Sequence, residues 1–401
     1  MSTAAKQTPL ATRNEPAIGI TGSLPPQVAQ DPAFAVSWEG TLTPTEGGDY
    51  YFGFRGAGFL RVWLDGKVFT MSYRGGQDAK LGRAHFEAGV AHALRVDYAP
   101  KAGSNAPGEL VWSKFDPHPS PEAIAAAKAA DVVVAVVGLT SELEGEEMAV
   151  SEDGFKGGDR TSLDLPKPEE DLLKAMAASG KPLVVVLLNG SALSVNWAKE
   201  HANAILEAWY PGEEGGAAVA QTLAGMNNPA GRLPVTFYTS VNDLPAFEDY
   251  SMANRTYRYF SGTPLYPFGY GLSYSEFKYG NVKLSTERLN AGEPLTVQAD
   301  VRNSSKRDGD EVVEVYLTYP KLPGAPKRAL CGFARVHVAA GKTEHVQLTI
   351  DPRSLSHVNE AGDRLISAGA YSLSVGGGQP GTGAQVVETP LTIRGESRLP
   401  E

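Results

Sequence analysis

The chain has 401 residues, of which 42% are hydrophobic and 20% charged, so it is long enough to bury the cores of two or three domains. Its formal net charge of −10 at pH 7 argues against a nucleic-acid partner, because neutralising phosphates requires clustered Lys and Arg. Cys331 is the only cysteine, which excludes an intrachain disulfide, and the dispersed histidines predict no metal site and no cofactor.

The N-terminal segment, residues 1–17, carries little pattern and is expected to be flexible. It lacks the apolar core of a signal peptide, and no apolar run approaches the roughly 20 residues of a membrane helix, so no membrane partner is expected. The sequence leaves the cellular compartment of the protein undecided. A bacterial periplasmic or secreted location and a cytoplasmic one both fit, because an export signal can lie upstream of a fragment.

Residues 18–116 read as short strands separated by glycine-rich turns. Asp65 and Gly66, within the stretch "WLDGKVF", form an Asp-Gly pair that is typical of a two-residue β-hairpin turn. This alternation of short strands and turns predicts a β-sandwich.

Residues 117–279 change to alternating helices and apolar strands. Ser120 is expected to cap a helix that has Pro121 at its first position, and the run "DVVVAVVG" that follows suits a strand buried on both faces. Two further strands with a helix pattern follow, so the segment predicts a parallel-sheet α/β sandwich, of which only a part is present.

Residues 280–395 return to short, regularly spaced strands and predict an antiparallel β-sandwich, which a short polar tail, residues 396–401, follows. The predicted fold class is therefore multidomain, α/β plus all-β, with three folded domains.

An acidic stretch, "GLTSELEGEEMAVSEDGFKGGDR", follows the first apolar strand of the α/β segment and holds seven carboxylates from Glu142 to Asp159. A solvated loop is the simplest interpretation. However, ligands of parallel sheets collect at the carboxyl ends of strands, where this stretch lies. Carboxylates in place of amides disfavour a phosphate site, and Ser191 lacks the Gly-x-Ser-x-Gly context of a serine nucleophile.

Several separated motifs resemble the C-terminal part of glycoside hydrolase family 3, the β-glucosidases and β-xylosidases. The segment "AWYPGEEGG…NPAGRLP" is similar to the family's W-x-P-G-x-E-G-G and NPSGRLP-type stretches, and "YPFGYGLSY" to its junction after the α/β domain. The strands from residue 307 to 346 resemble its fibronectin type III-like domain, and residues 18–116 a protective-antigen-type insert. The resemblance covers almost the whole chain.

The resemblance implies that a loop of the E-x-E-G-x-D-R type lends the general acid/base of a retaining, exo-acting glycosidase. Counting from Gly138 places that role on Glu146, with Glu144 as runner-up and Glu147 third. Retaining cleavage needs a nucleophilic carboxylate and a protonated one about 5 Å away, and neighbouring carboxylates help to keep an acid protonated. The alignment of this loop with the family pattern is open by a position or two, because twelve residues, 147–158, separate Glu146 from Asp159.

The family's N-terminal (β/α)8 barrel, which supplies the Asp nucleophile and most sugar contacts, has no counterpart in this sequence. A partner chain or a missing barrel is therefore implied, together with a β-linked oligosaccharide or glycoside as substrate, and the isolated chain is expected to be inactive. Glucosides and xylosides are equally compatible with the sequence. A non-catalytic carbohydrate-binding or interaction module is the alternative.

Overall fold

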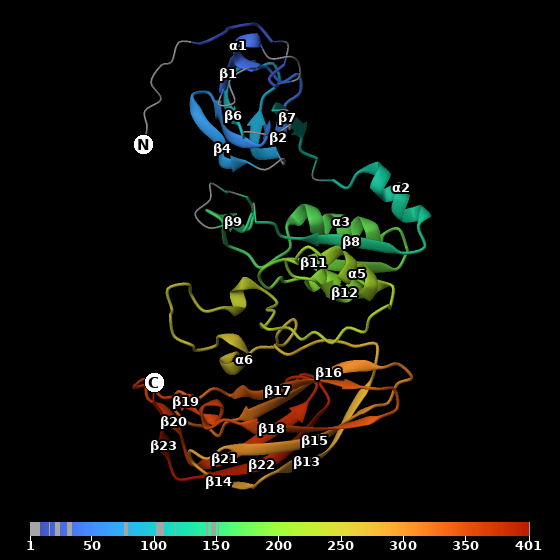
Figure 1. The fold of residues 1–401 in the computed structure, drawn as a ribbon, viewed down its shortest axis with the longest axis vertical. Coiled ribbons are helices and arrows are strands. Elements are labelled where there is room, and N and C mark those ends of the chain that lie inside the picture. The colour runs from blue at the N-terminus through green and yellow to red at the C-terminus, as the bar shows by residue number, and fades with distance from the viewer. Residues whose placement is uncertain are drawn as a thin grey trace. The chain divides into compact units, whose positions relative to one another are not determined.

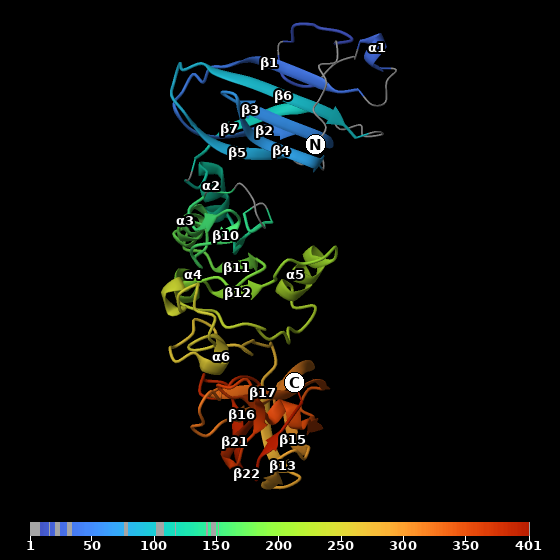
Figure 2. The same ribbon diagram turned by 90° about the vertical axis from the view of Figure 1, so that its left-hand side faces the viewer.

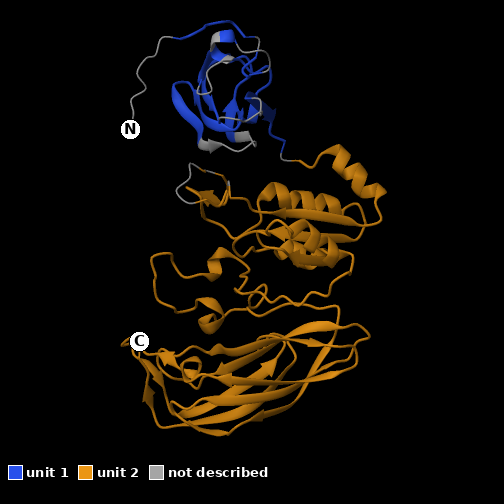
Figure 3. Cartoon of the chain, in the orientation of Figure 1, with its two compact units in different colours: residues 1–117 blue, residues 118–401 orange. Residues whose placement is uncertain are grey.

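The structure, a computed structural model, describes residues 9–15, 17–20, 25–29, 34–75, 79–101, 108–116, 118–141, 143–145, 150 and 152–400. The chain divides into two compact units, residues 1–117 and residues 118–401 (Figure 3). Each unit is described by itself below.

The first unit is a β-sandwich of two antiparallel sheets among the residues described (Figure 1). One sheet has the strand order β1-β6-β3-β4 and the other the order β5-β2-β7. The elements are α1 (Pro26–Ala29), β1 (Val36–Leu42), β2 (Gly48–Arg55), β3 (Gly58–Leu64), β4 (Lys67–Gly75), β5 (Ala79–Phe86), β6 (His92–Pro100) and β7 (Glu109–Lys114).

Local sequence explains this sandwich. Asp65 and Gly66 join β3 to β4 with φ angles of 51° and 76°, the left-handed conformation that the predicted Asp-Gly turn requires. Alternate strand residues fill the core between the sheets: Phe52 and Phe54 of β2 and Leu60 and Val62 of β3 are 0% exposed. The predicted β-sandwich is thus confirmed.

The second unit begins with a three-stranded parallel sheet in the order β12-β11-β8. Figure 2 shows α3 and α4 on one side of this sheet and α5 on the other. The elements are α2 (Pro121–Ala129), β8 (Val133–Gly138), β9 (Phe155–Lys156), β10 (Asp159–Arg160), α3 (Lys167–Ala177), β11 (Leu183–Leu188), α4 (Asn196–His201), β12 (Ala204–Glu207), α5 (Gly215–Leu223), η1 (Val241–Asp243) and α6 (Thr256–Tyr259).

Helix α2 starts as predicted. The Ser120 side chain accepts a hydrogen bond from the backbone N–H of Ala123 at 3.1 Å, and Pro121 occupies the first helical position.

Strand β8 departs from the prediction of a strand buried on both faces. Val133, Ala135 and Val137 are buried, but Val134 and Val136 are 45% and 57% exposed. Among the described residues, α3 is the helix that packs closely against β8, so it covers only the face that carries Val133, Ala135 and Val137.

A second sandwich completes this unit. It consists of sheets ordered β13-β15-β18, β14-β22-β21-β16-β17 and β19-β20-β23, and the pairing is antiparallel except between β14 and β22. Its elements are β13 (Phe277–Leu284), β14 (Arg288–Asn290), β15 (Leu295–Asn303), β16 (Gly309–Thr318), β17 (Arg328–Val338), β18 (Thr343–Ile350), η2 (Pro352–Leu355), β19 (His357–Val358), β20 (Arg364–Ile366), β21 (Gly369–Gly376), β22 (Val386–Arg394) and β23 (Ser397–Arg398).

The predicted fold class is confirmed by these sheets. The division of residues 117–279 from 280–395 stays a prediction, and β13 begins just before it, at Phe277. Within the segment predicted as a polar tail, Ser397 and Arg398 pair with β20. Among the residues described, no helix is long and apolar enough to cross a membrane.

A buried ion pair connects the two parts of the second unit. Arg232 Nη2 lies 2.8 Å from Glu311 Oε2, and the two side chains are only 9% and 4% exposed. Arg232 Nε also donates to the Gly377 carbonyl at 3.1 Å, and the Tyr279 hydroxyl donates to the second Glu311 oxygen. This network ties the segment after α5 to β13, β16 and the loop after β21.

Candidate active site

The predicted acid/base Glu146 lies outside the described residues, as do Glu142 and Glu147. Its assignment therefore stays a prediction. The runner-up Glu144 is described, and its surroundings define the candidate site.

The carboxylate of Glu144 lies where the three parallel strands end. One oxygen accepts a hydrogen bond from Ser191 Oγ, which follows β11, and the other accepts from the Tyr210 hydroxyl, which follows β12, at 2.8 Å. Burial, together with the neighbouring Glu144 carboxylate, raises the pKa of Tyr210 to about 12, so Tyr210 remains a donor at neutral pH. Side chains that follow all three strands thus meet at one edge of the sheet, as the topology requires.

Gly190 makes this meeting possible. A Cβ atom at Gly190 would lie 2.6 Å from a ring carbon of Tyr210 and 3.5 Å from a Glu144 oxygen. A side chain there would push the Tyr210 ring away from Glu144, so the Asn-Gly-Ser turn after β11 is part of the site.

Arg160 reaches the same place from the β9–β10 hairpin. Its Nη1 atom donates to Ser191 Oγ and to the Ala192 carbonyl, each at 2.9 Å, while its Nη2 atom is buried without a partner among the described residues. Gly157 and Gly158, both with positive φ, form the tight turn of this hairpin. The end of the predicted E-x-E-G-x-D-R loop is therefore a folded hairpin that aims a guanidinium at Ser191.

An open hollow of about 430 Å³ lies beside these groups. It is lined by Glu144, Gly145, Gly158, Asp159, Arg160 and Ser191. A carboxylate, a guanidinium and a hydroxyl line one concave surface, which is a combination suited to a polyhydroxylated ligand. Ser191 serves here as a hydrogen-bond donor to Glu144, in agreement with the weak case for a serine nucleophile.

A second carboxyl group lies near this edge of the sheet. Glu207, the last residue of β12, accepts hydrogen bonds from the Trp209 N–H at 3.0 Å and from Asn189 Nδ2 at 3.3 Å. Burial raises the pKa of Glu207 to about 7 despite these two bonds. Trp209 itself has a φ of 54°, an uncommon conformation for a bulky residue.

The raised pKa of Glu207 predicts a pH-dependent stability effect. From about pH 4.5, its ordinary pKa, to about pH 7, the unfolded chain loses this proton before the folded chain does, so folding stability falls as the pH rises. Glu207→Gln, which stays neutral, should raise the free energy of unfolding at pH 8 by on the order of 1–3 kcal/mol and leave it unchanged at pH 4. Urea unfolding at both pH values measures this, with the exposed Glu213→Gln as the control. An equal gain at both pH values would contradict it.

Sequence reasoning missed Ser191 and Tyr210 as partners of Glu144, and it missed Glu207. Each of these residues lies within three positions of the end of a strand in the parallel sheet. The rule that sites form at the carboxyl ends of such strands, applied to β11 and β12 as well as to β8, would have found them.

Comparison with known proteins confirms the resemblance seen in the sequence. Residues 8–274 match the model of the glycosyl hydrolase family 3 C-terminal domain, and residues 311–379 match that of the fibronectin type III-like domain. A xylan 1,4-β-xylosidase of Xylanibacter ruminicola is 36% identical over 345 residues, which cover 80% of this chain and 37% of the relative. A periplasmic β-glucosidase of Salmonella typhimurium is 37% identical over 268 residues, which cover 64% of this chain and 34% of the relative.

Solved structures agree with these relatives. A β-glucosidase from Kluyveromyces marxianus superposes with a TM-score of 0.64 at 26% identity, over 92% of this chain and 46% of that one. The chain thus spans less than half the length of the proteins that it matches. Because one family model covers most of its length, this chain belongs to glycosyl hydrolase family 3, of which it represents the C-terminal portion with a fibronectin type III-like domain.

Proposed function

We propose that this chain supplies the general acid/base of a retaining, exo-acting β-glycosidase, either a β-glucosidase or a β-xylosidase. Glu146 takes that role, with Glu144 as runner-up, and a (β/α)8 barrel from another segment or subunit brings the Asp nucleophile. β-Linked glycosides and oligosaccharides are the substrates. The relatives named above, a β-xylosidase and β-glucosidases, support this substrate class.

The observation that carries the proposal is the anchoring of Glu144 at the edge of the parallel sheet. Ser191 and Tyr210 hold its carboxylate beside an open hollow, and Glu146 follows only two residues later. With both of its oxygens occupied by donors, Glu144 is suited to fixing the loop. The acid/base role is therefore assigned to Glu146, the residue that the family pattern indicates, rather than to Glu144.

The chemistry then follows from retention of configuration. The nucleophile attacks the anomeric carbon while Glu146 protonates the leaving oxygen, and a glycosyl-enzyme forms. Glu146, now ionised, takes a proton from the water that attacks this intermediate. The leaving group and the water occupy the same side of the sugar, so one residue serves both steps.

The exposed face of β8 supports the need for a partner. Val132, Val134 and Val136 are 47%, 45% and 57% exposed, and β8 pairs with β11 alone among the described residues. A row of exposed valines along a strand that has one unpaired edge favours association with another polypeptide segment. The remainder of the glycosidase is the partner proposed for this face.

Reconstitution tests the proposal. The purified 401-residue chain alone should not hydrolyse an aryl β-glucoside or an aryl β-xyloside, because an acid without a nucleophile cannot form the glycosyl-enzyme. Adding a family barrel encoded beside it should produce turnover that saturates with barrel concentration. Turnover by the chain alone would contradict the requirement for a barrel. Saturable oligosaccharide binding without turnover in any mixture would favour the non-catalytic module instead.

A further inference from the structure

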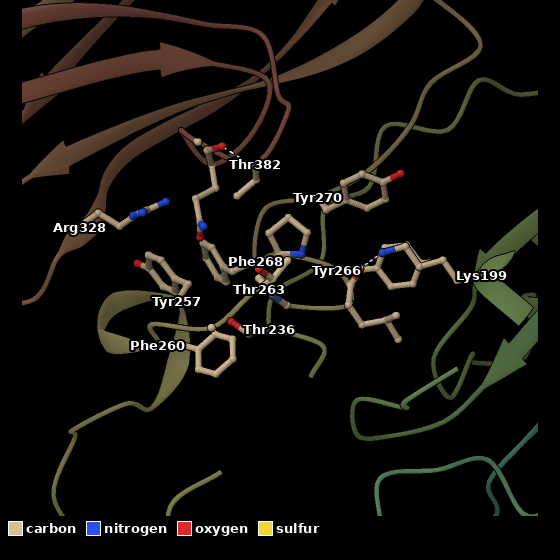
Figure 4. Close-up of a pocket in the computed structure, with 16 residues that line it drawn as sticks. Lys199, Thr236, Tyr257, Phe260, Thr263, Tyr266, Phe268, Tyr270, Arg328 and Thr382 are labelled. Atoms are coloured by element: carbon tan, nitrogen blue, oxygen red, sulfur yellow. Dashed lines mark hydrogen bonds between the residues drawn. The ribbon is translucent and has the colours of Figure 1, made fainter. Parts of the chain in front are cut away.

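A second cavity, of about 340 Å³, lies between the two parts of the second unit and is distinct from the hollow at Glu144 (Figure 4). Its walls come from α4, Thr236 in the segment after α5, α6 and the segment that follows it, the start of β17 and the loop between β21 and β22. Its volume falls within the roughly 300–1,000 Å³ that is typical of small-molecule sites.

Aromatic rings form much of the wall. Tyr257 and Phe268 stack with ring centroids 4.1 Å apart, and Tyr266 and Tyr270 pack at 5.3 Å. Such rings offer flat apolar surface to a ligand ring while their hydroxyls stay polar. Packing among themselves keeps these side chains in place without a ligand.

Two deeply buried polar side chains line this cavity without hydrogen-bond partners among the described residues. Thr236 is 7% exposed and Gln379 is 6% exposed, and the Thr236 hydroxyl and the side-chain oxygen Oε1 of Gln379 are both unpaired among the described residues. A buried polar group without a partner costs about 1–3 kcal/mol, so both atoms are suited to hydrogen bonds with an occupant of the cavity.

Arg328 brings a positive charge to the same cavity. It points inward from the start of β17 (Figure 4), and its Nη1 atom donates to the Pro380 carbonyl at 2.6 Å. Burial lowers the pKa of Arg328, and no described carboxylate pairs with it or lines the cavity. A half-buried guanidinium without a carboxylate partner is suited to a carboxylate on a ligand, which it can bind through two parallel hydrogen bonds.

Lys199, which lies on α4, reaches the cavity from the side opposite Arg328 (Figure 4). Its Nζ atom donates to the Leu265 carbonyl at 2.6 Å and lies 5.0 Å from the centre of the Tyr266 ring. It retains further N–H donors for the hydroxyl groups of an occupant.

We propose that this cavity binds a hydroxylated ring carboxylate of the uronic-acid class. Arg328 receives the carboxylate, Thr236 and Gln379 bind ring hydroxyls, and the aromatic wall packs against the apolar face of the ring. This site is independent of the proposed catalytic function, since none of its residues lines the hollow at Glu144.

Calorimetric titration of the 401-residue chain with three probes tests this site. D-Glucuronate should bind saturably. D-Glucose, which has a hydroxymethyl group in place of the carboxylate, and cyclohexanecarboxylate, which lacks the hydroxyls, should each bind at least about tenfold more weakly. Equal affinity for glucose and glucuronate, or no saturable binding of glucuronate, would overturn the proposal, and water alone would then satisfy the buried polar atoms.

Substitutions locate the binding. Arg328→Gln should lower the affinity for glucuronate at least about tenfold without changing the weak affinity for glucose. Arg307→Gln is the matched control, because Arg307 also donates to backbone carbonyls across this unit, at Gly225 and Asn227, but lies outside the cavity. It should leave glucuronate binding unchanged.

Thr236→Val separates binding from a purely structural role. Loss of an unpaired buried hydroxyl should stabilise the fold or leave it unchanged, whereas the affinity for glucuronate should fall about fivefold or more. If Arg328→Gln impairs folding, Thr236→Val and Arg328→Lys, which keeps the charge without the planar fork, still decide the question. Full glucuronate affinity in both of these variants would refute the site.

Discussion

Glu146→Ala, made in the enzyme reconstituted with its barrel, is expected to lower kcat/KM for alkyl β-glycosides by about 10²- to 10⁴-fold, the usual contribution of a general acid. Alkyl leaving groups depend on protonation to depart. The acidic phenol of an activated aryl glycoside leaves without that help, so formation of the glycosyl-enzyme from this substrate should be nearly unaffected. The ratio of the two effects, measured by steady-state kinetics, reports the acid role.

The base role has a separate signature in the same variant. Once the aryl glycoside has released its phenol and formed the glycosyl-enzyme, hydrolysis of this intermediate should stall because no carboxylate takes the proton from water. Azide needs no base, so adding it should restore turnover and yield a β-glycosyl azide. A burst of phenol followed by a slow phase that azide abolishes is the expected time course.

Glu144→Ala is the matched comparison two residues away. The structure gives Glu144 two hydrogen-bond donors, Ser191 Oγ and the Tyr210 hydroxyl. Removing the Glu144 carboxylate should therefore loosen the loop and lower kcat/KM for all substrates to a similar extent. Azide should not rescue this variant. If Glu144→Ala is rescued by azide while Glu146→Ala keeps near-normal rates, the acid/base is Glu144. If neither substitution matters, the acidic stretch is a solvated loop.

Local chemistry accounts for the parts of this fold that the sequence predicted well. The Ser120 cap and the Asp65-Gly66 turn depend on neighbouring residues alone, so short motifs identify them. Strands β8 and β11 were equally visible as apolar runs. The exposure of Val134 and Val136 could not be predicted, because a run of valines does not tell whether a helix covers each face of the strand.

The candidate site was predictable in part. The acidic loop and its place after a parallel strand indicated a site at this edge of the sheet, and the resemblance to the family assigned the acid/base to Glu146 with Glu144 as runner-up. Ser191 and Tyr210 lie 47 and 66 residues from Glu144, and no local pattern pairs side chains over such separations. Their meeting depends on the register of β8, β11 and β12, which only the folded sheet determines.

The buried pair of Arg232 and Glu311, 79 residues apart, gives the largest expected effect on stability. Arg232→Met should lower the free energy of unfolding by about 3–5 kcal/mol, because it leaves the Glu311 carboxylate buried without its cation. Urea unfolding at pH 7 measures this loss. The control Arg335→Met removes a pair with Asp310 whose side chains are 66% and 30% exposed, and should cost less than about 1 kcal/mol.

The double variant Arg232→Met with Glu311→Gln identifies the cause of that loss. A neutral glutamine removes the isolated charge while its carbonyl oxygen still accepts from the Tyr279 hydroxyl, so most of the lost stability should return. If the double variant is as unstable as Arg232→Met alone, the loss comes instead from the other bonds of Arg232, to the carbonyls of Gly377, Ala230 and Gly231. The guanidinium would then act as a connector between the α/β part and the sandwich, with its charge of secondary importance.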